Sequence, residues 1–266
     1  MSENAVHEAS VEKFSNYVNG LPLPEPRAGQ PVSNRRNCRH SAAMATLESK
    51  IETTEALLLG LLKHDPASIR VAWTGGKDST VVLFLWKTVL EHHDLGPARA
   101  ISLDTGCKFP EVMAFRDCMA GEWGVDLLVA RPEVDLATYP LAVDKVACCL
   151  DLKVKPLQKA IGATETAFLL TGLRRDEHPD RAARRDLEPR HTPPHTMVNP
   201  ILDWTETDIW AFHTMFDLAH CELYDRGYRS LGCRPCTEKG NGVSERSGRS
   251  GEKEKNMAVL TSLGYF

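Results

Sequence analysis

A Gly-rich segment that follows an apolar run offers phosphate-binding chemistry. It reads Thr74-Gly75-Gly76-Lys77-Asp78-Ser79, after the apolar residues 69–73. A strand that ends in such a turn and continues as a helix makes an anion site, because glycines let backbone N–H groups approach phosphate oxygens and a helix N-terminus is positive. Lys77 adds a point charge and Ser79 a hydrogen bond. A Walker A loop is excluded, because Asp78 stands where that motif requires Ser or Thr. The alternative is an ordinary strand–turn–helix junction.

Four cysteines form a second candidate site. Cys148 and Cys149 are adjacent, and Cys233 and Cys236 form a CxxC. Adjacent cysteines suit tetrahedral zinc poorly, because its paired ligands usually have two to four residues between them. In a cubane, neighbouring cysteines can bind different irons, so we predict a [4Fe–4S] cluster. Zinc, or thiols and disulfides, are the alternatives. The other cysteines are interpreted as small buried apolar side chains: Cys38, Cys107, Cys118 and Cys221.

The elements that must position these residues alternate between strand and helix patterns. The predicted strands are residues 69–73, 100–104, 126–130 and 167–171. The predicted helices are residues 41–64, 79–91, 110–122, 154–161, 205–215 and 252–263. Such alternation predicts an α/β fold: a doubly wound, mainly parallel sheet with helices on both faces and right-handed crossovers.

Three loops should meet at the carboxyl ends of the strands, where open α/β sheets bind ligands. They cover residues 74–79, 104–106 and 171–176. We expect one cleft there, with Lys77 exposed in it. Asp104 is expected to hold Mg²⁺ or a ribose, with a turn-forming role as the alternative. The predicted nucleotide-binding residues are Thr74, Gly75, Gly76, Lys77, Ser79, Asp104, Thr105 and Gly172, and the predicted catalytic residues are Lys77, Asp78 and Ser79.

Arginines on two further segments are candidate ligands for phosphate or adenylate oxygens, which their planar forks suit. A solvated charged face is the alternative for those in the first segment. The charge-dense stretch 174–190, with prolines up to residue 194, predicts a mobile loop over the cleft. The candidates are Arg174, Arg175 and Arg181 in the first segment, and Arg246 and Arg249 in the second.

Length, composition and net charge limit the possible domain organisation, partners and cellular compartment. With 266 residues, 42% of them hydrophobic and 26% charged, the chain suits one large α/β domain. We expect a flexible arm over 1–39, the main domain over 40–225 and a tail over 226–266 packed on that domain. A net charge of −4 argues against a surface that coats nucleic acid. The sequence has neither a membrane-spanning apolar run nor a signal pattern, so we expect a cytoplasmic protein.

Several strings resemble known families. The segment TGGKDS is similar to the pyrophosphate loop SGGKDS of the ATP pyrophosphatases, which cleave ATP between the α- and β-phosphates. Further strings resemble the phosphoadenosine-phosphosulfate reductase-like superfamily, which implies an adenine nucleotide α-hydrolase-like fold. The CC…CxxC arrangement resembles adenylyl-sulfate reductases, where it holds a [4Fe–4S] cluster. The further strings are LDTGCKFPEV at 103–112, CCLDLKVKPL at 148–157, TGLRRDEHPDRA at 171–182, NPILDWTETDIW at 199–210 and YRSLGCRPCTE at 228–238.

The end of the sequence departs from the reductases, which attack the sulfonucleotide with a cysteine near the C-terminus. Here no cysteine follows Cys236, and the strings SERSGR at 244–249 and LGYF at 263–266 resemble the small subunit of sulfate adenylyltransferase. That subunit lacks the four cysteines. The mixture resembles the ATP-pyrophosphatase component of bacterial DNA phosphorothioation systems, and its length is closer to the SspD kind than to the DndC kind.

The resemblance implies an iron–sulfur ATP pyrophosphatase that uses ATP with Mg²⁺ to adenylate a substrate for sulfur transfer. The implied partners are a cysteine desulfurase as sulfur donor, the other phosphorothioation components, and DNA reached through those partners. A homodimer is among the expected assemblies. The alternatives are an assimilatory sulfonucleotide reductase or sulfate-activating enzyme, and a catalytically silent nucleotide-binding subunit that recruits a desulfurase.

Overall fold

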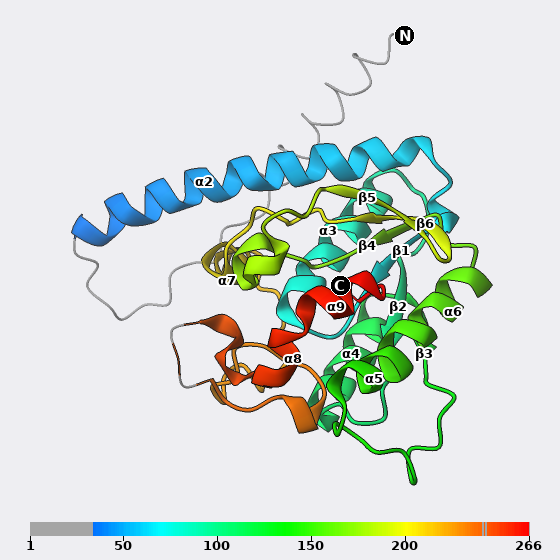
Figure 1. Ribbon diagram of the computed structural model, residues 1–266. Coiled ribbons are helices and arrows are strands. Elements are labelled where there is room, and N and C mark those ends of the chain that lie inside the picture. The colour runs from blue at the N-terminus through cyan, green and yellow to red at the C-terminus, as the bar shows by residue number, and fades with distance from the viewer. Residues whose placement is uncertain (1–33, 241, 243, 266) are drawn as a thin grey trace.

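The computed structural model describes residues 34–240, 242 and 244–265, with side chains from residue 47 onward. Helix α2 (Asn34–Leu59) runs across the top of the view in Figure 1 and contacts the helices below it. The predicted arm falls outside the described residues up to position 33. Residues 34–39, assigned to that arm from the sequence, are instead helical.

A six-stranded sheet forms the centre of the fold. Its strand order is β3-β2-β1-β4-β6-β5, and every neighbouring pair is parallel except β5 and β6. The predicted mainly parallel sheet is therefore confirmed, and all four predicted strands are present to within two residues at each end. The strands are β1 (Ile69–Ala72), β2 (Arg99–Leu103), β3 (Asp126–Ala130), β4 (Phe168–Leu170), β5 (Leu187–His191) and β6 (Pro194–Val198).

The hairpin of β5 and β6 corrects the prediction of a mobile loop over 174–190. Two short 3₁₀ turns, Arg175–Glu177 and Pro179–Arg181, begin this stretch, and the chain then enters β5. The prolines misled the prediction, because proline is tolerated on an edge strand such as β5, whose outer side needs no ladder hydrogen bonds.

Helices cover both faces of the sheet, as predicted. Side chains alternate along a strand, so Ile69 and Val71 join an apolar cluster with α2, α3 and α7, whereas Ala72 packs with Leu157 and Ile161 of α6. Burial on both faces fixes the register of the central strands. The remaining helices are α3 (Lys77–His92), α4 (Pro110–Glu122), α5 (Lys145–Cys149), α6 (Lys155–Ala163), α7 (Glu206–Met215), α8 (Gly251–Lys255) and α9 (Met257–Ser262).

The last two helices return to the body of the molecule. α8 and α9 contact α5, and Cys149 packs with Met257 and Leu260 (Figure 1). The tail over 226–266 thus packs on the main domain in the part that the structure describes.

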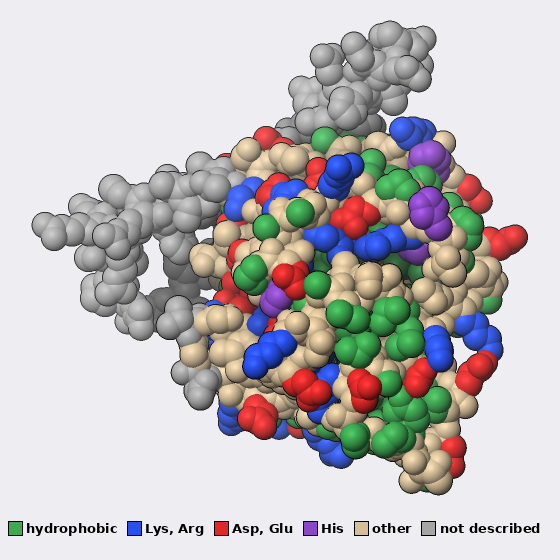
Figure 2. All heavy atoms as spheres, viewed as in Figure 1, with side chains coloured by type: hydrophobic (Ala, Val, Ile, Leu, Met, Phe, Trp, Pro, Cys, Tyr) green, Lys and Arg blue, Asp and Glu red, His purple; other side chains and the backbone are tan. Residues whose placement is uncertain are grey.

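One face of the molecule can be inspected for how its charges are distributed. On the face shown in Figure 2, basic and acidic side chains are interspersed, and no extended basic area is visible there. Among the described helices, none has the length and apolar character needed to span a membrane.

Candidate nucleotide pocket and thiol cavity

The loop between β1 and α3 is preorganised by its own side chains. Gly75 has a φ of 75°, and a Cβ there would lie 3.1 Å from Val112 Cγ1. The backbone N–H of Thr74 donates to Ser79 Oγ at 3.2 Å, and that of Gly76 donates to Thr74 Oγ1 at 3.3 Å. The loop leads directly into the N-terminus of α3, a helix of 16 residues, whose positive end faces the pocket.

The end of β4 lies directly against this loop. A Cβ on Gly172 would come within 2.7 Å of Ser79 N and 3.0 Å of the Asp78 carbonyl carbon, so only glycine fits without a shift of the backbone. The three loops predicted to share a cleft are therefore neighbours at the carboxyl ends of β1, β2 and β4. One pocket is lined by residues from all three and from the tail, including Thr74, Gly76, Asp78, Ser79, Thr105, Gly172, Arg181, Arg246 and Arg249.

Lys77 is not exposed in this pocket, and that prediction is wrong. Its side chain is only 1% exposed. The ammonium pairs with Glu245 and, at 3.2 Å, with Asp78, and it donates to the Arg229 carbonyl at 3.3 Å. Burial works to lower the pKa of Lys77, but the carboxylates outweigh it and raise the pKa above its ordinary value. Lys77 therefore stays protonated, and its charge is neutralised by the carboxylates of Asp78 and Glu245.

Arg174 is likewise committed to protein carboxylates. Its side chain is 0% exposed, with Nε 2.7 Å from Asp78 Oδ1, Nη1 2.5 Å from Asp176 Oδ1 and Nη2 2.5 Å from Glu245 Oε2. It thereby joins the loop before α3 to the tail.

The other predicted phosphate ligands divide between the pocket and the surface. Arg246 forms a two-bond pair with Glu254 at 2.7 and 2.8 Å, and Arg181 pairs with Glu177. Both line the pocket, but Arg175 pairs with Asp203 and does not. Asp104 also lies outside the lining: it accepts from Gly106 N at 3.0 Å and Arg131 Nε at 3.2 Å, as the turn-forming alternative requires.

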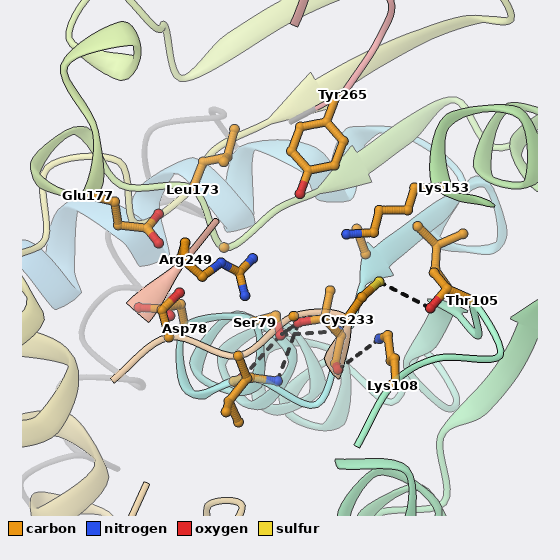
Figure 3. A pocket seen from close by; sticks show the side chains of 18 of the residues that line it. Asp78, Ser79, Thr105, Lys108, Lys153, Leu173, Glu177, Cys233, Arg249 and Tyr265 are labelled. Carbon is orange, nitrogen blue, oxygen red and sulfur yellow. Dashed lines mark hydrogen bonds between the residues drawn. The ribbon is translucent and has the colours of Figure 1, made fainter. Parts of the chain in front are cut away.

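Three cations in the pocket have no carboxylate partner among the described residues: Lys108, Lys153 and Arg249. Lys108 Nζ donates to the Thr74 carbonyl at 3.3 Å, and Arg249 Nη1 donates to Thr237 Oγ1 at 3.2 Å. Arg249 Nε is buried without a hydrogen-bond partner. Figure 3 shows these side chains around one opening. Burial lowers the pKa of Lys108 to about 8.

Sequence reasoning overlooked Lys108 and Lys153, although both lie inside strings singled out above, LDTGCKFPEV and CCLDLKVKPL. Lys153 belongs to a π-helical turn, Leu150–Val154, that joins α5 to α6. Such turns often occur at functional sites, because one extra residue redirects the side chains.

A second, smaller cavity gathers the cysteines. All four predicted cluster ligands line it: Cys148, Cys149, Cys233 and Cys236. Cys107 lines it too, so the interpretation of Cys107 as a merely apolar side chain is corrected. Three lysines, at 145, 153 and 253, complete the wall and would offset the charge of thiolates. Cys118, also interpreted as buried, is exposed, whereas Cys221 is buried as predicted. The side chain of Cys38 lies outside the described set.

The donor set fits an iron–sulfur cluster better than zinc. Four tetrahedral ligands at the zinc–sulfur distance of about 2.3 Å would lie roughly 4 Å apart. Among the described residues, only Asp78, Glu177 and Glu245 form a set of three or more potential ligands within 4.8 Å of one another. No three of the described thiols lie that close to one another, so their arrangement does not match a tetrahedral zinc site. A hydrogen bond from Cys107, together with Lys153, lowers the pKa of Cys233 to about 3 and favours the ligating thiolate.

The three close carboxylates are not a ready Mg²⁺ site. Asp78 and Glu245 are paired with Lys77 and Arg174, and Glu177 pairs with Arg181. Their charge is already balanced by protein cations. The expected Mg²⁺ role of Asp104 is not supported either, because Asp104 is held by its own loop and Arg131.

The pocket and the cavity share part of one wall. Cys233 and Lys153 line both, and Thr105 Oγ1 lies 3.3 Å from Cys233 Sγ. An anion held in the pocket would therefore lie next to whatever the thiols bind.

Comparison with known proteins agrees with this arrangement. The family model described as phosphoadenosine phosphosulfate reductase domain matches residues 68–239. Adenosine 5'-phosphosulfate reductase of Bacillus pumilus (strain SAFR-032) is 33% identical over 161 residues, which cover 57% of this chain and 68% of that protein.

Solved structures share the fold. FMN adenylyltransferase of Candida glabrata, in complex with FAD and inorganic pyrophosphate, has a TM-score of 0.65 at 17% identity, covering 97% of this chain and 91% of that one. Phosphoadenylyl-sulfate reductase of Candida auris, in a phosphate complex, has a TM-score of 0.60 at 18% identity, covering 79% and 100%. With the sequence match over its central region, the chain belongs to the phosphoadenosine phosphosulfate reductase domain family.

Proposed function

We propose that this chain is an enzyme that binds an adenine nucleotide by its phosphates and acts at the α-phosphorus beside an iron–sulfur cluster. The observation that carries this proposal is the set Lys108, Lys153 and Arg249, which line the pocket without carboxylate partners in the described structure. Partly buried cations without a carboxylate partner favour an anionic ligand. The N-terminus of α3, at the same pocket, adds to that preference.

The reaction that we propose is adenylation by ATP. An oxygen of the acceptor bonds to the α-phosphorus while the bond to the oxygen bridging the β-phosphorus breaks, so pyrophosphate leaves and the acceptor carries AMP. The terminal sulfur of a donor persulfide then bonds to the acceptor phosphorus, and AMP leaves with the acceptor oxygen. A second thiol cleaves the remaining S–S bond, so that the sulfur stays on the acceptor and the two thiols are oxidised to a disulfide. The chain's part is to position the phosphates on residues 74–79 and to neutralise charge with Lys108, Lys153 and Arg249.

The proposal includes a [4Fe–4S] cluster but assigns no role to protein-bound Mg²⁺. Cys148, Cys149, Cys233 and Cys236 would hold the [4Fe–4S] cluster, which supplies a redox-active, sulfur-rich surface next to the nucleotide. We derive no step through Mg²⁺, since the carboxylates near the pocket are committed to ion pairs. A metal that arrives with ATP would depend on the phosphates for its ligands.

The setting that we propose is DNA phosphorothioation, with a cysteine desulfurase as sulfur donor and the DNA phosphate as acceptor, reached through the other components of that system. This part of the proposal is supported by the strings SERSGR and LGYF together with the four cysteines.

A second candidate is reduction of adenosine 5'-phosphosulfate, the activity in the name of the Bacillus pumilus relative. That reaction needs a free thiol that can reach the sulfur. Cys233 is the cysteine that lines the described pocket, and it belongs to the proposed cluster set. No cysteine follows Cys236 in the sequence.

One experiment separates the two candidates. Anaerobically purified protein is given ATP with the acceptor DNA and sulfur donor, or adenosine 5'-phosphosulfate with reduced thioredoxin. We expect AMP and pyrophosphate from the first and no sulfite from the second. Sulfite release would select the reductase, and its loss in Cys107→Ser or in Cys38→Ser would identify the attacking thiol.

Nucleotide binding tests the coarser proposal. Arg249→Ala should weaken ATP binding about tenfold or more, because a hydrogen bond to a charged group contributes about 1.5–3 kcal/mol. Arg175→Ala is the matched control, since Arg175 is paired outside the pocket. Equal ATP affinities in the two variants, by calorimetry, would refute the assigned pocket.

A further inference from the structure

The hydroxyl of Tyr224 is bonded to the phosphate-binding loop from a distant part of the chain. The backbone N–H of Lys77, the first residue of α3, donates to the Tyr224 hydroxyl oxygen at 3.0 Å, across 147 positions of sequence. A Cβ on Gly76 would lie 3.4 Å from the same oxygen. Tyr224 also lines the nucleotide pocket, together with Thr74 and Ser79. The hydroxyl therefore lies at the boundary of the pocket, bonded to an N–H of a helix N-terminus.

The ring of Tyr224 is held by packing. It lies against the apolar cluster that contains Phe109 and Val112. The Trp210 ring meets it edge to face, with the centroids 5.3 Å apart and the planes at 82°. Lys77 Nζ lies 5.6 Å from the ring centroid. Such packing fixes the position of the hydroxyl, so a ligand in the pocket would meet a preorganised polar group.

The hydroxyl of Tyr224 keeps its proton. Burial raises the pKa of this phenol and the Asp78 carboxylate adds to the effect, while Lys77 opposes it; the result is a pKa above the ordinary value. Because the oxygen accepts the Lys77 N–H, the O–H itself remains able to donate. Within the part of the chain that the structure describes, the Lys77 N–H is the hydrogen-bond partner of this hydroxyl, and the O–H has no acceptor.

Several N–H groups of the loop are already used. Those of Thr74 and Gly76 donate to side-chain oxygens of the loop itself, and that of Lys77 donates to Tyr224. A phosphate oxygen that approaches the start of α3 would therefore meet the hydroxyl of Tyr224 in place of the Lys77 N–H. A hydroxyl that accepts from a positive helix end is polarised, and this strengthens it as a donor to an anion.

We propose that Tyr224 contacts the substrate: its hydroxyl accepts from the Lys77 N–H and donates to an oxygen of the nucleotide's phosphate chain. The N-terminus of α3 is thereby extended by one hydrogen bond. The inference rests on the proposed nucleotide site and adds to it a residue from the segment between α7 and the CxxC pair. Tyr224 lies outside the strings singled out from the sequence, which end at residue 210 and resume at residue 228.

The test measures ATP affinity in Tyr224→Phe, which keeps the ring and removes only the hydroxyl. Dissociation constants are determined by calorimetry on the full chain, purified without oxygen. We expect binding about tenfold weaker than in the parent, because one hydrogen bond to a charged oxygen is lost. If the hydroxyl merely blocked the start of α3, the freed Lys77 N–H would bind the phosphate and affinity would rise. Unchanged or tighter binding would therefore overturn the inference.

Hydrogen exchange separates a direct contact from a damaged loop. It is measured by mass spectrometry on the nucleotide-free variant, over peptides that cover residues 69–85. These peptides should keep the protection of the parent, apart from the single amide of Lys77, which loses its acceptor. Faster exchange throughout them would assign the lost affinity to the structure of the loop, and the inference would fail.

The matched control is Tyr228→Phe. Tyr228 packs against the same apolar cluster but lies outside the pocket lining, so this variant should bind ATP as the parent does. Equal losses of affinity in the two variants would also overturn the inference and leave Tyr224 a packing residue. Failure of the parent protein to bind ATP would instead refute the proposed nucleotide site itself.

Discussion

Lys77, the first residue of α3, is ion-paired with Glu245, which lies 168 residues further along the chain. Glu245 also accepts from Arg174 Nη2 at 2.5 Å, so one tail carboxylate holds two cations that follow strand ends. The phosphate-binding loop is therefore completed by the tail. Lys77, Glu245 and Arg174 are all buried, so removing any one of them leaves buried charge that is only partly compensated.

Lys77→Ala should destabilise the protein, because it leaves the buried carboxylates of Asp78 and Glu245 to share the single charge of Arg174. The expected loss is about 3–5 kcal/mol in the free energy of unfolding, measured by chemical denaturation. Lys87→Ala on the same helix is the control, since Lys87 pairs with the exposed Glu91 at 2.6 Å and should cost less than about 1 kcal/mol. Equal unfolding midpoints for the two variants would show that the buried pair does not contribute.

Protein purified without oxygen should be brown and carry about four irons per chain if a cubane occupies the thiol cavity. Cys233→Ala should lose the iron and the colour, and with them stability, because cluster binding is coupled to folding. Cys118→Ala, which changes an exposed cysteine on α4, should keep both. Iron analysis and visible absorbance provide the measurement. One zinc per colourless chain would be the contrary result.

Gly172→Ala should abolish nucleotide binding. The new methyl group would lie 2.7 Å from Ser79 N and push β4 away from the phosphate-binding loop. Gly121→Ala provides the control, because a Cβ there meets nothing within 4 Å and α4 should become slightly more stable. Calorimetric titration with ATP compares the two variants. Parent-like affinity in Gly172→Ala would mean that the loop can move without loss of function.

Glu55 should make stability depend on pH. Burial, helped by the charge of Glu52, raises the pKa of Glu55 from 4.5 to about 8, and Oε1 has no hydrogen-bond partner. The folded state therefore binds the proton more tightly, so this contribution is complete below about pH 4.5 and is lost as the pH rises toward 8. Glu55→Gln should be more stable than the parent at pH 8, and the difference should shrink toward pH 5.

Thermal or denaturant unfolding at several pH values measures this difference. Glu48→Gln, an exposed change on the same helix, controls for the loss of one negative charge. A difference between Glu55→Gln and the parent that stays constant from pH 5 to pH 8 would show that Glu55 does not titrate in this range.

Local patterns were enough to predict four of the six strands, the cleft at their carboxyl ends and the grouping of the cysteines. Apolar runs bounded by turns gave β1 to β4, and the predicted helices 110–122 and 205–215 match α4 and α7 to within one residue. The grouping of the four cysteines followed from the spacing of two pairs. The signals for strands and helices lie within a few neighbouring residues. The four cysteines could be grouped because a metal cluster needs several thiolate ligands in one place.

Ion-pair choices could not be predicted in the same way. Nothing near Lys77 or Arg174 in the sequence indicates that Glu245 will take their charge, because that contact forms only when the tail folds back. Lys108 and Lys153 are candidate ligand-binding residues because neither has a carboxylate partner in the described structure. The sequence alone does not show which lysines remain without such a partner. The β5–β6 hairpin was hidden by prolines that an edge strand accepts.

Lys153 and Cys233 form part of the wall on both sides, toward the nucleotide pocket and toward the thiol cavity. Ligands that use the same side chains are energetically coupled, and such coupling is reciprocal. By whatever factor a bound cluster changes the affinity for nucleotide, bound nucleotide must change the affinity for the cluster by the same factor. If the thiols hold a cluster, the occupancy of the pocket thus becomes a determinant of how readily that cluster is lost.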